Sequence, residues 1–261
     1  PEVQKAINRV QPPEMIEALL TTEIRSLFRG VNFDLLYGLP LQTQETVERT
    51  IDQTLAFRPD RITLLKYCHV PEVRKHMKMI RETDLPRPEE LPVMFVNIAH
   101  RLISAGYQWI WLDHFALASD DLAIAHMTGG VGRTFNGFTP GRTRDMIGVG
   151  PTTTTAIGSH YAQSYYDLND YYNAVNKGEF PIQRGVSLSY DDCLRREVIF
   201  SLLCSQKCDF RAYGNYFNAE LTALEAYPDL CFLRNGTLYV TEMGRLLLRT
   251  VCKIFDKRDV K

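Results

Sequence analysis

Short apolar runs bounded by Gly or Pro recur in the first half of the chain and predict buried β-strands. FDLLY predicts a strand over residues 32–37, and RITLLKY predicts a second over 61–67. YQWIWLDHFA predicts a third over 107–116 that ends in polar residues. Because neighbouring residues of a strand point to opposite faces, Asp113 and His114 are not expected to pair with each other.

The segments between these runs carry apolar residues at helical spacing. A first helix is expected after Pro12 and Pro13, and a second is expected to begin at the N-cap Thr43 and to end before Pro59. A third helix is expected over 87–104, followed by Gly106, and a fourth is expected after the N-cap Ser119. Strands that alternate with helices predict parallel pairing with helical crossovers. A complete eight-stranded barrel takes about 250 residues, so only part of one fits.

The pattern changes in the second half. Residues 129–158 are rich in Gly and Thr, and from residue 167 onward the texture is helical. Residues 229–241 predict a β-hairpin around Asn235-Gly236, and a last helix closes the chain. We therefore expect an α/β fold: part of a (β/α) TIM-like barrel over 1–164, then a mainly helical, winged-helix-like domain over 165–261.

Composition narrows the classes of protein. Hydrophobic residues make up 45% of the 261, as is typical of a soluble globular protein. The 30 Lys+Arg and 31 Asp+Glu nearly cancel, which argues against a nucleic-acid binder. No apolar run is long enough for a membrane span. The six cysteines follow neither a disulfide nor a metal-site spacing, so we expect them to be reduced core thiols and not metal ligands. Cys204 and Cys208 are four residues apart and are expected on one face of a helix.

Polar residues at the predicted strand ends are candidates for a site, because ligands of parallel sheets bind there. Asp34 lies inside an apolar run and needs either a partner or a ligand. His69 is either a ligand-facing donor or structural. The turn IGVGPTTTT over 147–155 permits close approach of a ligand, or is simply a buried turn. Arg195 and Arg196 are expected to form salt bridges with Asp191, Asp192 or the barrel rather than to contact nucleic acid.

Segments along nearly the whole chain resemble one family, the oxygen-independent coproporphyrinogen III oxidases. They are FDLLYGLPLQT, LDHFA, TFNGFT, GVGPTTTTAIGSHYAQ, GVSLSYDDCLRREVIFSLLC and VTEMGRLLLRTVCKIFD. A sister family of haem chaperones shares the YGLP element but differs from this chain over 113–116. A haem-binding, chaperone-like relative without oxidase activity, with His114 or His69 on the iron, is the alternative.

The resemblance implies a radical S-adenosylmethionine enzyme of porphyrin and haem biosynthesis. A [4Fe–4S] cluster on a CxxxCxxC motif reduces S-adenosylmethionine, and the resulting radical starts the oxidative decarboxylation of coproporphyrinogen III to protoporphyrinogen IX. This chain has no CxxxCxxC. We therefore expect a C-terminal part of such an enzyme, inactive alone, with its cluster ligands outside the chain. An electron donor as partner, a cytoplasmic location and a monomeric full-length protein are also implied.

Four residues match cofactor-binding positions of the family. Arg9 in VQKAINR and Asp34 match residues that contact S-adenosylmethionine. Cys68 falls where the family often has Ala, and Thr154 falls where it often has Ile. The resemblance leaves the catalytic residues unassigned and implies no metal ligand within this chain.

Overall fold

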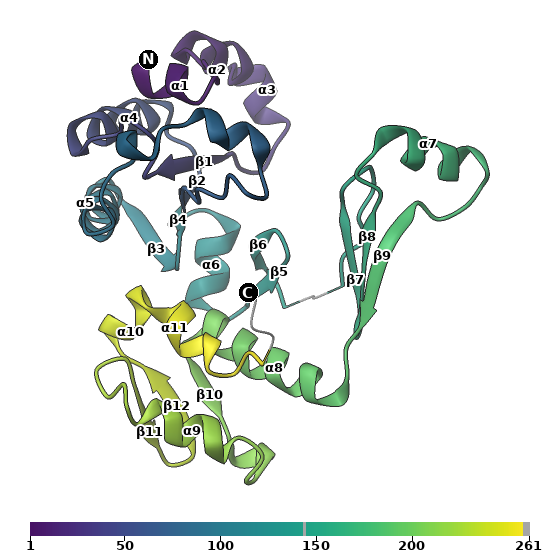
Figure 1. Ribbon diagram of the computed structural model, residues 1–261. Helices are drawn as coiled ribbons and strands as arrows, with labels where there is room; N and C mark the ends of the chain where they lie inside the picture. The colour runs from purple at the N-terminus through teal and green to yellow at the C-terminus, as the bar shows by residue number, and fades with distance from the viewer. Residues whose placement is uncertain (143–144, 258–261) are drawn as a thin grey trace. The chain divides into compact units, whose positions relative to one another are not determined.

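The structure, a computed structural model, describes residues 1–142 and 145–257 (Figure 1). It has mixed helix and sheet content, and its contacts divide the chain into two compact units, Pro1–Ile124 and Ala125–Lys261. This division falls earlier in the chain than 164/165, and a domain boundary at 164/165 stays a prediction. No helix of the described part has the length and apolarity that a membrane crossing requires.

The first unit is built on a four-stranded sheet in the order β1-β2-β4-β3. Its strands are β1 (Asn32–Tyr37), β2 (Arg61–Lys66), β3 (Tyr107–Trp111) and β4 (His114–Leu117). β1 and β2 pair in parallel, as predicted, because α4 (Gln44–Phe57) carries the chain back between them.

The expected single strand over 107–116 is wrong, and so is its parallel pairing. The chain reverses at Leu112, whose φ of 51° is left-handed, so β3 and β4 form a hairpin. A tight reversal can join only antiparallel strands, and β4 therefore pairs antiparallel with β2 as well as with β3.

Local signals set most helix boundaries of this unit. Thr43 and Thr46 form a capping box at the start of α4, and Gly106, with φ +92°, follows α5 (Glu90–Ser104), both as predicted. The cap expected at Ser119 is instead Asp120, whose Oδ1 accepts from the Leu122 amide at 2.8 Å. The remaining helices are α1 (Glu2–Ala6), α2 (Pro13–Leu19), α3 (Thr22–Ser26), η1 (Lys75–Met79), η2 (Glu82–Asp84) and α6 (Asp121–Met127).

The helix expected after Pro12 and Pro13 is in fact two helices, because the Thr21 side chain caps α3 after α2 has ended.

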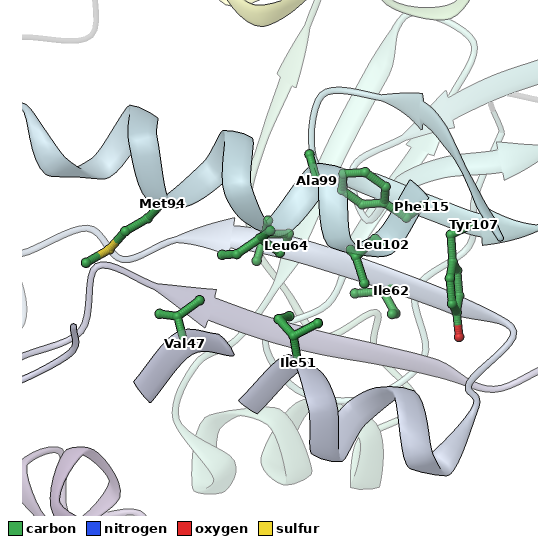
Figure 2. Packing of buried hydrophobic residues seen from close by; sticks show 10 residues of the cluster. Val47, Ile51, Ile62, Leu64, Met94, Ala99, Leu102, Tyr107 and Phe115 are labelled. Carbon is green, nitrogen blue, oxygen red and sulfur yellow. The ribbon is translucent and has the colours of Figure 1, made fainter. Parts of the chain in front are cut away.

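Helices α4 and α5 cover one face of the sheet and bury its core (Figure 2). The core cluster consists of Val47, Ile51, Ile62, Leu64, Met94, Ile98, Ala99, Leu102, Tyr107 and Phe115. Because side chains alternate along a strand, Phe33, Leu35 and Tyr37 of β1 point toward the helices, and the other face of β1 stays exposed.

The described residues of the second unit form three antiparallel sheets. The first is the hairpin of β5 (Val131–Thr134) and β6 (Gly137–Pro140). The second holds β7 (Thr154–Ile157), β8 (His160–Ser164) and β9 (Ile182–Ser187), side by side with α7 (Leu168–Asn176) at one end (Figure 1). The third has the order β10-β12-β11, from β10 (Lys207–Asp209), β11 (Cys231–Arg234) and β12 (Thr237–Val240), and includes the predicted hairpin at Asn235-Gly236.

Several sequence expectations for this unit are wrong in detail. Strand β9 interrupts the region from 167 onward that was expected to be helical. The last helix is two short ones, α10 (Glu242–Leu246) and α11 (Leu248–Lys253). Cys208 lies in β10, not on a helix with Cys204, because Gln206 leaves α8 (Tyr190–Ser205) in a left-handed conformation. η3 (Arg211–Tyr213) and α9 (Asn218–Leu224) complete the unit.

Arg195 of α8 links three segments of this unit and is almost fully buried. Its guanidinium donates to Asp191 at 2.9 Å and to Glu220 of α9 at 2.7 Å, which confirms the predicted pairing with Asp191. It also donates to the carbonyl of Phe255 at 3.1 Å. Burying this charge is tolerable because each of the three nitrogens donates to an acceptor and the guanidinium lies over the Phe217 ring.

Leu102→Ala should lower the free energy of unfolding by about 3 kcal/mol, because the side chain is fully buried in the core cluster and its removal leaves a cavity. The measurement is the urea midpoint. Ile103→Ala is the matched control, since the neighbouring side chain on α5 is 46% exposed and should change stability by less than about 1 kcal/mol. Equal losses in the two variants would contradict the core assignment.

The second unit should lose stability in acid through Asp191. Hydrogen bonds from Tyr216 and Arg195 lower the pKa of Asp191 from 3.8 to about 2. A lowered pKa stabilises the fold above the unfolded value, and this contribution disappears as the pH falls toward about 2. Unfolding midpoints at about pH 5 and about pH 2 should therefore differ less in Asp191→Asn than in the wild type. An unchanged pH dependence in the variant would contradict this.

Candidate functional site

The face of the first unit's sheet that points away from α4 and α5 carries a row of polar side chains, of which Asp34 is exposed and Thr63 and His114 are largely buried. The register places Asp34 of β1 opposite Thr63 of β2, and Thr63 opposite His114 of β4. Because Phe115 points into the core, its neighbour His114 faces the other way. Three strands thus bring Asp34, Thr63 and His114 into one line on one face.

Asp34 is exposed on this face and is held in position by its neighbours. The side-chain amide of Asn32 donates from Nδ2 to Asp34 Oδ1 at 2.7 Å, and the hydroxyl of Thr63 donates to the Asn32 side-chain oxygen at 3.1 Å. This chain of bonds fixes the rotamer of Asp34 while most of its acceptor capacity faces outward. The arrangement suits a carboxylate that receives hydrogen bonds from a polar ligand.

Asp113 and His114 do pair, contrary to expectation. Asp113 Oδ1 lies 2.7 Å from His114 Nδ1, and their side chains are only 13% and 12% exposed. The expectation failed because Asp113 belongs to the hairpin turn after Leu112, where strand alternation does not apply. The carboxylate orients the imidazole and fixes which ring nitrogen carries the proton.

The other matched residues are distributed along the chain. Arg9 is exposed after α1 and donates to Gln11 at 3.0 Å. Cys68 is exposed just beyond the carboxyl ends of β1 and β2, next to His69, whose Nδ1 lies 3.1 Å from the Tyr67 hydroxyl. Thr154 is half-buried in β7 of the second unit. The structure thus places Asp34 and Cys68 on the same two-strand segment.

Sequence reasoning missed Asn32 and Thr63. Asn32 is two residues before Asp34, so strand alternation alone places both on one face. Thr63 follows only from the register between β1 and β2, which the sequence does not contain.

The turn over 147–155 is not the buried turn that was one of its two interpretations. Ile147 and Val149 are 75% and 86% exposed. The turn braces itself: the amide of Gly148 donates to Thr155 Oγ1 at 3.0 Å, and Thr153 Oγ1 donates to the Gly150 carbonyl at 2.8 Å. A Cβ on Gly148 would lie 2.7 Å from that of Thr153, so this position accepts only glycine without rearrangement.

Within residues 1–142 and 145–257, no group of three His, Cys, Asp or Glu side chains is arranged to hold a metal ion. Burial raises the pKa of Cys208 to about 11 and that of Cys252 to about 12, which keeps both thiols protonated at neutral pH. Cys231 is buried as well, and its pKa is raised for the same reason.

Comparison with known proteins adds to this geometry. The chain is 36% identical over 266 residues to an oxygen-independent coproporphyrinogen III oxidase of Pseudomonas aeruginosa, covering 98% of this chain and 58% of that protein. The protein of that name from Escherichia coli gives the same identity and coverage. One from Thermostichus vulcanus is 37% identical, with 98% of this chain and 82% of that protein covered. No protein-family model matches the chain.

A solved structure is similar throughout as well. It is coproporphyrinogen III oxidase from Escherichia coli, described as a radical SAM enzyme; the TM-score is 0.90 at 36% identity, over 98% of this chain and 61% of the other. The likeness in sequence and fold indicates a family of enzymes rather than of binding modules. The chain belongs to the oxygen-independent coproporphyrinogen III oxidase family. It spans 58% of the length of the first two relatives.

Proposed function

We propose that the chain is part of a radical S-adenosylmethionine enzyme that converts coproporphyrinogen III to protoporphyrinogen IX by oxidative decarboxylation without oxygen. The observation that carries this proposal is the match of 98% of the chain, in sequence and in fold, to oxidases of this name. The Asp34 carboxylate, which Asn32 holds in position, also supports the proposal, because it can accept hydrogen bonds from a polar cofactor.

The residues of the first unit fit S-adenosylmethionine as a ligand. Its ribose hydroxyls and amino group are hydrogen-bond donors, and the exposed Asp34 carboxylate of β1 is a fixed acceptor. Bound to the enzyme and reduced, the cofactor supplies the radical that abstracts hydrogen from the substrate propionates. Such a radical has to be enclosed away from water, which we expect of the complete enzyme with this ligand bound.

The other cofactor positions are proposed with roles that suit their chemistry. The Arg9 guanidinium suits the cofactor carboxylate. Cys68 lies where a backbone group at the strand end can reach a ligand, and the Thr154 hydroxyl replaces an apolar contact by a polar one. The [4Fe–4S] cluster is assigned no ligand in this chain, because its described residues hold no suitable group. The isolated chain should therefore bind S-adenosylmethionine without cleaving it.

The finer architecture is also a proposal. We take the four-stranded sheet with its outer helices as a segment of a TIM-like barrel, and the part from 165 as a winged-helix-like domain, which the β11–β12 hairpin that follows α8 and α9 in the chain supports. A monomeric full-length enzyme served by a separate electron donor in the cytoplasm completes the proposal. None of the six cysteines is in a disulfide, which suits that compartment.

Asp34→Asn should weaken S-adenosylmethionine binding about ten-fold, because a charge-assisted hydrogen bond is replaced by a neutral one. Isothermal titration of the 261-residue chain measures this. Asp52→Asn is the control, an exposed aspartate on α4 whose ion pair with Arg101 is a surface one. Equal affinity of Asp34→Asn and wild type would remove Asp34 from the site.

The reaction itself is tested in a chimera. The part of the Escherichia coli oxidase that this chain does not span is joined to it, and conversion of coproporphyrinogen III is followed anaerobically by product fluorescence after oxidation. We expect protoporphyrinogen IX from the chimera and a lower rate from its Asp34→Asn form. Two results would contradict the proposal: a folded chimera that makes no product although its cluster is loaded, or cleavage of S-adenosylmethionine by the isolated chain.

A further inference from the structure

One face of the β7-β8-β9 sheet combines apolar side chains with arginine. The register aligns Thr154, Gln163 and Arg184 in one row across the three strands, and aligns Ala156, Tyr161 and Val186 in the next. Because side chains alternate along each strand, these two rows share a face. The three strands contain no Asp or Glu, so nothing on the strands themselves offsets the positive charge.

Arg184 is exposed, and a hydrogen bond from its Nε atom to Gln163 orients its guanidinium. Its Nε donates to Gln163 Oε1 at 2.8 Å. Gln163 is in turn fixed by donating to the Tyr166 hydroxyl at 3.1 Å. Among the described residues, no carboxylate lies within ion-pair distance of Arg184, and its two terminal nitrogens donate to no protein atom. A guanidinium held through Nε presents the paired N–H groups that bind a carboxylate.

A second arginine reaches the same face. Arg196 of α8 donates from Nη1 to the Gly158 carbonyl at 2.7 Å, and this nitrogen lies 3.5 Å from the Tyr161 hydroxyl. Tyr161 and Gln163 are two residues apart on β8, which places the sites that the two arginines contact about 7 Å apart. One carboxylate lies at the same end of the sheet, because Asp145 accepts from the Gly158 amide at 2.8 Å. The face thus offers positive charge at two points, with Tyr161, Ala156 and Val186 between and beside them.

We propose that this face binds the substrate tetrapyrrole through its carboxylates, with Arg184 pairing with one propionate and the apolar row contacting the macrocycle. The inference rests on the proposed function, since it takes coproporphyrinogen III as the ligand. A flat apolar ring with carboxylates at its rim is complementary to an apolar strip flanked by guanidinium groups. Thr154, a proposed cofactor contact, lies in the same row as Arg184.

The test measures binding of coproporphyrin III, the stable oxidised form of the substrate, to the 261-residue chain by porphyrin fluorescence. Arg184→Gln should weaken binding about ten-fold, because one charged hydrogen-bonded pair is lost. Arg184→Lys should recover only part of the affinity, because an ammonium keeps the charge but not the paired donors. The tetramethyl ester of the porphyrin should bind equally to wild type and Arg184→Gln.

Arg234→Gln is the matched control, since Arg234 is an equally exposed strand arginine of the same unit and its loss changes the net charge by the same amount. It should change affinity less than about two-fold. Thermal unfolding of each variant checks folding, and Arg184→Lys keeps the test valid if Arg184→Gln is unstable.

The outcomes separate this site from the proposed function. Coproporphyrin III binding that is equal in Arg184→Gln and wild type, or equally weakened in Arg234→Gln, overturns the site alone. A wild-type chain that binds S-adenosylmethionine through Asp34 but no porphyrin also overturns the site. A wild-type chain that binds neither ligand contradicts the proposed function itself.

Discussion

The burial of the apolar faces of α4 and α5 against one side of the β1-β2-β4-β3 sheet is the constraint on which the first unit depends. Because successive side chains of a strand point to opposite faces, the residues between the core residues must point away from the helices. Ile62 and Leu64 must point toward the helices, and Thr63 between them must point away. The polar row of Asp34, Thr63 and His114 is a direct consequence of this packing, because the core cluster occupies the opposite face of the sheet.

The second unit follows a different rule, because a buried charge organises it. Arg195 ties α8 to α9 and to the last residues of the chain through Asp191, Glu220 and the Phe255 carbonyl. Such a network is stable only when all of its members are present. The unit thus contains this buried polar network and, separately, the β7-β8-β9 sheet, on which Arg184 is exposed. In the proposed function, Asp34 of the first unit contacts the cofactor, and Arg184 of this sheet pairs with a substrate carboxylate.

Sequence patterns predicted those features that depend on neighbours in the chain. The strands over 32–37 and 61–67, the N-cap at Thr43 and the turn at Asn235-Gly236 all rest on local rules, and the structure confirms each. The strand over 107–116 failed because a single left-handed residue, Leu112, reverses the chain where no Gly or Pro announces a turn. The supposed helical pair of Cys204 and Cys208 failed for a similar reason at Gln206.

By itself, the sequence determined the alternation of strands and helices in the first unit, the family resemblance, and the isolated acid at Asp34. Only the tertiary structure decided what surrounds that acid. The register between β1 and β2 brings Thr63 to Asn32, and the hairpin turn brings Asp113 onto His114. Likewise, strands distant in the chain align Arg184 with Gln163 and Thr154. Pairing between strands is set by long-range packing, and no local pattern of residues specifies which partner a given side chain will meet.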